Sequence, residues 1–275
     1  MTEADAIAKS ELPATVESLV ADLRALGVRE GMTLAVHSSL SGLGWVVGGP
    51  HAVVLALQRA VTDSGTLCLP AYSTDNSEPV HWKDPAVPDA WHQTVRDHMP
   101  AFDERMSHTR GMGAIAELFR RAPDVRRSNH PAVSWCAWGR YARAITQDHR
   151  LNSGFGEDSP LARVYDLGGS VLLIGVGHDR NSSLHLAEHR ADWPGKTQMK
   201  QGAAIMVGEH RQWVQFEDLK LSAGDFPEIG WDFIRAGHVK TGQVACAKAQ
   251  LMDQRTLVDF AAQWISTRRR DKPDA

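Results

Sequence analysis

The residues best suited to chemistry in this chain lie in one polar stretch around position 185. A buried strand is predicted over residues 170–176, and a glycine turn with a polar N-cap then begins a helix predicted over residues 181–190. On that helix His185, Glu188 and His189 are spaced i, i+3 and i+4, so they share one face. Such a face supplies a general base and a carboxylate that orients it. Active sites of open α/β sheets lie beyond the carboxyl ends of strands, where this helix begins.

The same letters also form a His-x-x-Glu-His string, which is the pattern of inverted zinc peptidases. In that interpretation His185 and His189 bind zinc and Glu188 activates a water molecule. The helix is short for this role, because Trp193-Pro194-Gly195 ends it within about two turns. Zinc hydrolysis therefore stays an alternative, and we expect no bound metal. A solvated polar helix face is a third interpretation.

A second feature is a glycine-rich loop over residues 38–49, between a strand predicted at 33–37 and a helix predicted at 52–61. Glycines such as Gly42 and Gly44 let backbone amides approach a phosphate, and the amides at a helix start point toward negative charge. The spacing matches neither a dinucleotide fingerprint nor a P-loop. A cofactor pyrophosphate loop and a turn without a ligand both remain open, and coenzyme A carries a pyrophosphate as nucleotides do.

Acidic residues form a third feature. Asp75 and Glu78 lie in a long irregular segment over residues 72–110, and Glu217 and Asp218 follow a predicted hairpin. Carboxylates that line a cleft bind protonated amines through charge-assisted hydrogen bonds. A solvated surface acid is the commoner role for each one alone, so a joint role requires the loops to converge. Rings that can stack on a sugar flank these segments: Tyr72, Trp82, Trp91 and Trp213.

The apolar pattern alternates strands with helices, which is typical of an α/β fold. We find no internal repeat and no low-complexity linker, so we predict one α/β domain over residues 1–275, with a central mixed sheet flanked by helices. Further strands are predicted at 65–70 and 132–138, and a hairpin at 203–217. Further helices are predicted at 15–26, 113–121, 139–146, 160–167 and 251–267.

Composition excludes several classes of function. A net charge of −3 without a basic stripe argues against nucleic acid as a partner, and no run of about 18 apolar residues can span a membrane. The amino-terminal segment lacks the pattern of a secretory signal, so we expect a cytoplasmic protein. Cys68, Cys136 and Cys246 form no Cys-x-x-Cys pair and are expected to be reduced core thiols. We expect flexible tails at residues 1–14 and 268–275.

Several blocks resemble the aminoglycoside 3-N-acetyltransferase family, in the family's order, over about residues 16–220. The resemblance implies the family's own α/β arrangement, distinct from the GNAT fold, with acetyl-CoA as donor and the 3-amino group of a 2-deoxystreptamine aminoglycoside as acceptor. The implied activity confers antibiotic resistance. The blocks are Val36-His37-Ser38-Ser39-Leu40, Gly65-Thr66-Leu67 with Leu69-Pro70, Arg127-Ser128-Asn129-His130-Pro131, Asp158-Ser159-Pro160-Leu161-Ala162-Arg163, and Leu172 through Glu188.

The resemblance also implies roles for single residues. His185 is the expected general base, which takes a proton from the acceptor amine during direct attack on the thioester, with no acetyl-enzyme. Either Glu217 or Glu188 orients it, and the sequence does not choose between them. The residues expected at the donor site are Ser38, Ser39, Leu40, Gly42, Gly44 and Ser159. Those expected at the acceptor site are Tyr72, Asp75, Glu78, Asp179 and Asp218.

Two further hypotheses stay open beside this activity. The scaffold could bind coenzyme A and act on an amine that is not an antibiotic, or it could be a coenzyme A or nucleotide sensor that does not catalyse. The expected partners are an aminoglycoside and coenzyme A, and the chain is expected to be a monomer or a homodimer.

Overall fold

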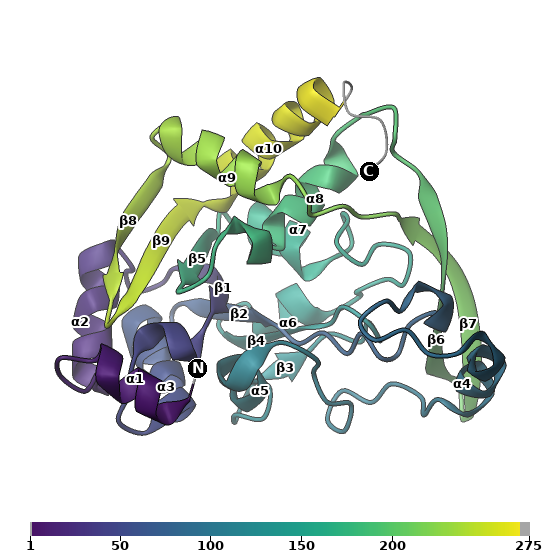
Figure 1. Ribbon diagram of the computed structural model, residues 1–275, viewed down its shortest axis with the longest axis horizontal. Coiled ribbons are helices and arrows are strands. Elements are labelled where there is room, and N and C mark those ends of the chain that lie inside the picture. Colours follow the sequence, from purple (N-terminus) through teal and green to yellow (C-terminus); the bar gives the residue numbers. More distant parts are fainter. Residues whose placement is uncertain (1, 270–275) are drawn as a thin grey trace.

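The computed structural model describes residues 2–269. It contains a seven-stranded sheet in the order β3-β4-β2-β1-β5-β9-β8 and a separate hairpin, β6–β7, which stands at one side of the molecule (Figure 1). The expected α/β fold with a central mixed sheet is confirmed. The strands are β1 Thr33–Ser38, β2 Thr66–Pro70, β3 Arg126–Arg127, β4 Trp135–Gly139, β5 Ser170–Ile174, β6 Gln198–Val207, β7 His210–Leu219, β8 Val239–Val244 and β9 Ala247–Asp253.

Helices cover both faces of the sheet (Figure 1). Local chemistry fixes their ends: the Thr15 side chain caps the amino terminus of α2, and Gly27 ends that helix in the left-handed conformation. The α-helices are α1 Glu3–Lys9, α2 Val16–Leu26, α3 Gly49–Val61, α4 His92–His98, α5 Gly113–Phe119, α6 Ala142–Thr146, α7 Pro160–Asp166, α8 Ser183–Arg190, α9 Phe226–Arg235 and α10 Gln254–Arg268. Short 3-10 helices are η1 Leu40–Leu43, η2 Pro79–His81, η3 Asp89–Trp91 and η4 His178–Arg180.

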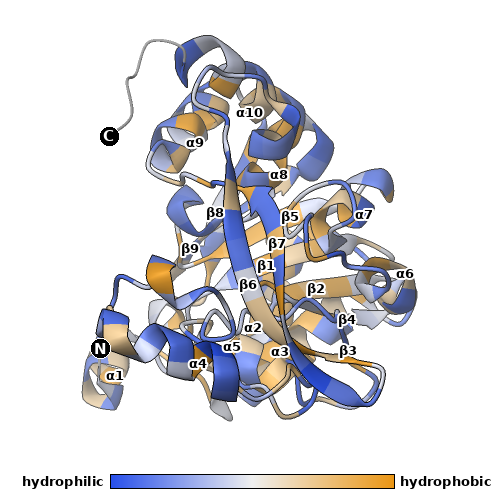
Figure 2. Ribbon diagram, turned by 90° about the vertical axis from the view of Figure 1, so that its right-hand side faces the viewer, coloured by the Kyte–Doolittle hydropathy of each residue, from blue (hydrophilic) through white to orange (hydrophobic). Residues whose placement is uncertain are grey.

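The centre of the sheet is parallel, because β1 pairs with both β2 and β5 in the same direction, while the outer pairs are antiparallel. Alternate residues of β1 face opposite sides: Leu34 and Val36 belong to one apolar core, and Ala35 belongs to the other. A strand buried on both faces reads as a continuous apolar run. In Figure 2 the central strands are mostly apolar (orange), and the hairpin in front of them is more polar (blue).

The structure differs most from the predicted elements after residue 220. The helix predicted at 251–267 begins instead at Gln254, because Asp253 caps it and the preceding residues continue β9. The sequence analysis missed β8 and α9 altogether. Strand β8 is an exposed edge whose residues are mostly solvent-facing, so it carries no apolar alternation that a sequence pattern would register.

Parts of the two predicted terminal tails have regular secondary structure. Residues 3–9 form α1, and its end is held to the glycine-rich loop because Lys9 Nζ donates to Gly42 O (2.8 Å). At the other end, α10 continues to Arg268, and Arg269 is nine-tenths buried rather than solvated. Residues 270–275 lie outside the described part of the chain.

The segment over residues 72–110, predicted to be irregular, contains α4.

Within residues 2–269, no helix is both long enough and apolar enough to cross a membrane.

Two buried histidines, His130 and His149, hold the loop that precedes α7 through hydrogen bonds to its backbone. Their rings pack 4.7 Å apart, and His149 bonds to Ser128 Oγ (2.9 Å) and to Gly154 O (2.9 Å). Desolvation lowers the pKa of His130 to about 4 and lowers the pKa of His149 well below its usual value. Both rings are therefore neutral in the folded protein at neutral pH.

The two buried histidines predict that the folded protein loses stability in acid. Histidines of the unfolded chain bind protons near pH 6.5, whereas the folded protein resists that binding, so the unfolded state holds more protons below this pH. The free energy of unfolding should be fully maintained above about pH 6.5 and should fall as pH drops toward 4. Urea unfolding across this range measures the slope. His149→Gln should flatten it, whereas His210→Gln, at the exposed hairpin turn, should leave it unchanged. An equal slope in all three proteins would contradict the assignment.

Candidate active site

The carboxyl ends of β1, β2 and β5 open into a cavity of about 560 Å³. Ser38, Ser39 and Leu40 line it from the end of β1, and Tyr72 lines it after β2. His185 lines it from α8, which follows β5. The structure thus gathers, at the end of the parallel strands, residues that the sequence placed in three different segments.

His185 and Glu188 form a hydrogen-bonded dyad on α8. The His185 Nδ1 atom lies 2.6 Å from Glu188 Oε2, and the Glu188 side chain is completely buried. The other oxygen, Oε1, accepts hydrogen bonds from Ser222 N (2.9 Å) and from Arg269 Nη1 (2.7 Å). Since an ionised carboxylate can only accept, Nδ1 carries the proton and Nε2 is left as the basic nitrogen.

Two aromatic rings pack against the imidazole. His185 packs against Phe155, with ring centroids 4.7 Å apart, and against Phe226 at 4.8 Å. Phe155 in turn meets Tyr72 edge to face, and the Tyr72 hydroxyl donates to Ser182 Oγ (2.7 Å). A ring held by a carboxylate and two aromatic neighbours has little freedom to rotate, as a general base requires.

The sequence left Glu217 and Glu188 as equal candidates to orient His185, and the geometry separates them. Glu217 is exposed on β7, where it pairs in register with Lys200 of β6, whereas Glu188 is bonded to the histidine directly. The neighbour of Glu217, Asp218, points to the opposite face of the hairpin, because side chains alternate along a strand. Glu188 therefore orients the imidazole in this structure.

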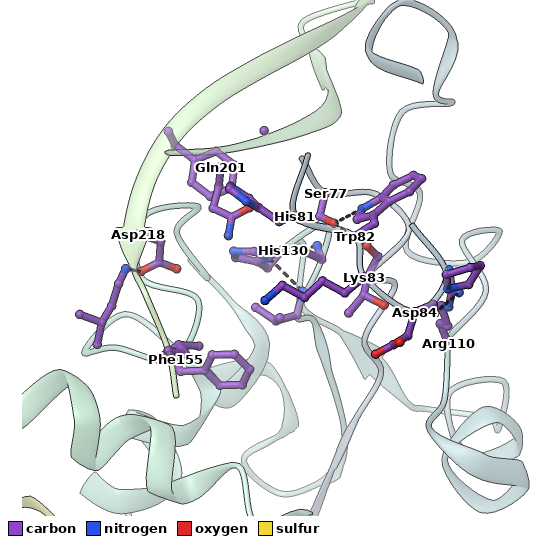
Figure 3. A pocket seen from close by; sticks show the side chains of 18 residues that line it. Ser77, His81, Trp82, Lys83, Asp84, Arg110, His130, Phe155, Gln201 and Asp218 are labelled. Atoms are coloured by element: carbon purple, nitrogen blue, oxygen red, sulfur yellow. Dashed lines mark hydrogen bonds between the residues drawn. The ribbon is translucent and has the colours of Figure 1, made fainter. Parts of the chain in front are cut away.

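Phe155 is one of the residues that line a second cavity, of about 330 Å³ (Figure 3). The loop over residues 74–85 and the hairpin form its walls. Asn76 ties these walls together, because its side-chain amide bonds to both backbone groups of Ala204 on β6 (2.9 and 2.8 Å). Phe155 borders this cavity and contacts His185, which lines the first cavity.

Asp218 is the predicted acceptor-site acid that lines this second cavity (Figure 3). Its Oδ2 accepts from Gly154 N (3.0 Å), which fixes the loop that carries Phe155. Burial raises the pKa of Asp218, while the backbone hydrogen bonds from Gly154 and Leu219 lower it. Asp84, which the sequence analysis did not single out, lines the same cavity.

The other predicted acids are placed differently. Asp75 pairs with Arg110, and Glu78 is buried against Arg96 (2.6 Å), so arginines of the same segment neutralise both carboxylates. Asp179 lines the first cavity instead, at its exposed rim. No local pattern indicated these pairings, since Arg96 and Arg110 lie 18 and 35 residues from their partners.

Three of the predicted donor-site residues do not line the first cavity. Gly42 allows two loops to touch, because a Cβ there would lie 3.1 Å from Gly175 Cα. Gly44 has a φ of +79° and would meet the Cys246 sulfur at 2.9 Å, so it serves packing as well. Ser159 is fully buried as the N-cap of α7.

His37 lines the first cavity and was missed as a site residue, although it stands in the Val36-His37-Ser38-Ser39-Leu40 block. His37 ends a predicted buried strand, and that position suggested a core residue and not a site residue. It packs edge to face against Trp135, and its buried Nε2 has no hydrogen-bond partner within residues 2–269. Desolvation, with the nearby charge of His185, lowers the pKa of His37 to about 3, so this ring stays neutral.

The zinc interpretation finds no support in this geometry. Glu188, which would have to activate water, is fully buried and bonded to His185 and Arg269. In the part of the chain that the structure describes, no group of three or more His, Cys, Asp or Glu side chains is arranged to hold a metal ion.

The fold is shared with proteins of known structure. A family model described as aminoglycoside 3-N-acetyltransferase matches residues 35–266, and the chain belongs to this family of acyltransferases.

Individual relatives cover nearly the whole chain. It is 41% identical to the aminoglycoside N(3')-acetyltransferase-like protein YokD of Bacillus subtilis, over 94% of this chain and 95% of that protein. It is 38% identical to aminoglycoside N(3)-acetyltransferase VIII of Streptomyces fradiae, over 98% and 97% of the two chains. The crystal structure of YokD superposes with a TM-score of 0.95 at 39% identity and covers 98% of this chain and 100% of its own.

Because Glu188 and not Glu217 is bonded to His185, we expect substitutions of the two glutamates to affect activity differently. Glu188→Gln removes the charge that fixes the tautomer of His185, so kcat/KM should fall about 10²- to 10⁴-fold in an acetyl-transfer assay. Glu217→Gln is the matched control on the exposed face of β7 and should stay within about twofold of the parent enzyme. Comparable losses in both variants would show that Glu188 is not the orienting carboxylate.

Proposed function

We propose that the protein transfers the acetyl group of acetyl-CoA to the 3-amino group of a 2-deoxystreptamine aminoglycoside. The observation that carries the proposal is that His185, hydrogen-bonded to Glu188, lines the first cavity and contacts Phe155, which lines the second. A base in this position can act where a thioester and an amine held in neighbouring cavities meet.

Relatives support both substrates. A solved structure of AAC-IIIb with CoASH superposes on this chain with a TM-score of 0.84 at 32% identity. Solved structures of AAC-VIa with sisomicin and of AAC(3)-IVa with a gentamicin also match, with TM-scores of 0.83 and 0.78. We assign acetyl-CoA to the first cavity, beside Ser38, Ser39 and Leu40, and the aminoglycoside to the second, beside Asp218 and Asp84.

The proposed reaction uses His185 Nε2 as the general base. It removes a proton from the acceptor amine while the amine nitrogen attacks the thioester carbonyl carbon. Glu188 stabilises the resulting imidazolium through Nδ1. The carbon–sulfur bond then breaks, the sulfur leaves with the electron pair, and the imidazolium returns the proton to give CoASH and the acetamide. No acetyl-enzyme forms in this scheme.

The general-base role predicts that His185→Ala loses at least about 10²-fold in turnover while its thermal unfolding stays cooperative. Thiol release from acetyl-CoA in the presence of an aminoglycoside panel measures this. His189→Ala on the same helix is the control, because zinc hydrolysis would need both histidines. Near-normal turnover of His185→Ala, or equal loss in the two variants, would contradict the proposed role.

The assignment of cavities predicts a split in Michaelis constants. Asp218→Asn keeps the size of the side chain but removes a charge from the second cavity, so KM for the aminoglycoside should rise about 10-fold or more. KM for acetyl-CoA should change less than about twofold. Glu217→Gln, one residue earlier on the outer face, is the control. A rise confined to KM for acetyl-CoA would reverse the assignment of the cavities.

A further inference from the structure

The carboxyl-terminal end of α10 lies next to Glu188 of the dyad. Arg269 follows the last residue of this helix, and its side chain is nine-tenths buried. Its Nη1 donates to Glu188 Oε1 (2.7 Å), on the carboxylate oxygen that does not face His185. A residue predicted to lie in a flexible tail thus contacts the partner of the proposed base. It also lies beyond residue 266, where the family match ends.

Arg269 is itself held by several contacts. Its Nε and Nη2 donate to the two oxygens of Asp225 (2.6 and 2.7 Å), and Nη2 also donates to Ser222 O (2.7 Å). The guanidinium lies over the Trp193 ring at 5.0 Å from its centroid. A planar fork bound on three sides has a fixed position, which a lysine could not reproduce.

The charges in this group nearly balance. Glu188 is fully buried and Asp225 is nine-tenths buried, and Arg269 supplies one positive charge between them. One negative charge then remains, and a protonated His185 cancels it. Without the guanidinium, the two buried carboxylates would repel each other with no cation between them, and an uncompensated buried ion is strongly unfavourable.

We propose that Arg269 is a positioning residue for acetyl transfer: it fixes Oε1 of Glu188, so that Oε2 stays aligned with His185 Nδ1. This inference rests on the proposed function of the dyad. Ser222 N holds the same Oε1 from the chain between β7 and α9. The alignment of the base therefore depends on the end of α10 as much as on α8.

The neighbouring arginine provides a matched control. Arg268 donates to Asp232 (2.7 Å), its side chain lies over Trp264, and it is half-exposed. Substitution of Arg268 removes the same charge from the same helix end without touching Glu188. A general effect of helix charge would affect both arginine variants, whereas an effect on the dyad would affect Arg269 alone.

The experiment compares Arg269→Gln, Arg269→Lys and Arg268→Gln by the pH dependence of kcat/KM. A nearby cation favours the unprotonated dyad, and catalysis requires unprotonated Nε2, so loss of the cation should move the acid limb to higher pH. Arg269→Gln should also lower kcat about 10-fold, with KM for acetyl-CoA within about twofold. Arg269→Lys should restore the acid limb more than kcat, because it returns the charge without the fork. Arg268→Gln should match the parent.

A second variant tests the sign and guards against misfolding. Asp225→Asn removes a negative charge from the same group, so the acid limb should move to lower pH, opposite to Arg269→Gln. Thermal unfolding checks that each variant folds. If Arg269→Gln lowers kcat but leaves the acid limb of the pH profile unmoved, Arg269 has only a structural role. If the acid limb moves in the same direction in Arg269→Gln and Asp225→Asn, the inference is wrong.

An NMR titration of the His185 imidazole, assigned with a His185→Gln spectrum, needs no substrate. It should show the same opposite shifts for Arg269→Gln and Asp225→Asn. If acetyl transfer fails with every aminoglycoside but these shifts occur, the proposed acceptor is wrong and the coupling of Arg269 to the dyad stands. If transfer occurs without the shifts, the inference about Arg269 fails alone.

Discussion

The buried carboxylate of Glu188 is the constraint on which the site depends. Removal of an ion from water costs several kcal/mol unless charge and hydrogen bonds replace the lost hydration. Here the replacement comes from His185 on the same helix, from the Ser222 amide before α9, and from Arg269 at the end of α10. Three distant segments must therefore be in place together before the imidazole is oriented, which links the integrity of the fold to the chemistry.

The two cavities are built from different parts of the chain. The first lies at the ends of the parallel strands, where the rigid centre of the sheet fixes the lining residues. The second is formed by the loop over residues 74–85 and by the hairpin, both outside the main sheet, and Asp218 joins it to the loop that carries Phe155. Under the proposed assignment of the cavities, changes in these outer segments alter acceptor recognition.

Sequence patterns predicted the elements that carry strong local signals. The buried strands at β1, β2 and β5 are continuous apolar runs, and α2 has a polar cap, an apolar stripe and a terminal glycine. The edge strand β8 and the join between β9 and α10 were missed. An exposed edge strand shows no alternation, and β9 is followed by α10 with no loop between them, since Asp253 is both the last residue of the strand and the cap of the helix.

The sequence alone determined that His185 and Glu188 share a helical face after a buried strand, because helical geometry fixes the spacing of side chains. It could not decide between Glu188 and Glu217, or tell that Arg96 and Arg110 neutralise two of the predicted acids. It also assigned Arg269 to a tail. These properties belong to the tertiary structure, because burial and the choice of a charged partner depend on groups far apart in the chain, whose approach no local pattern records.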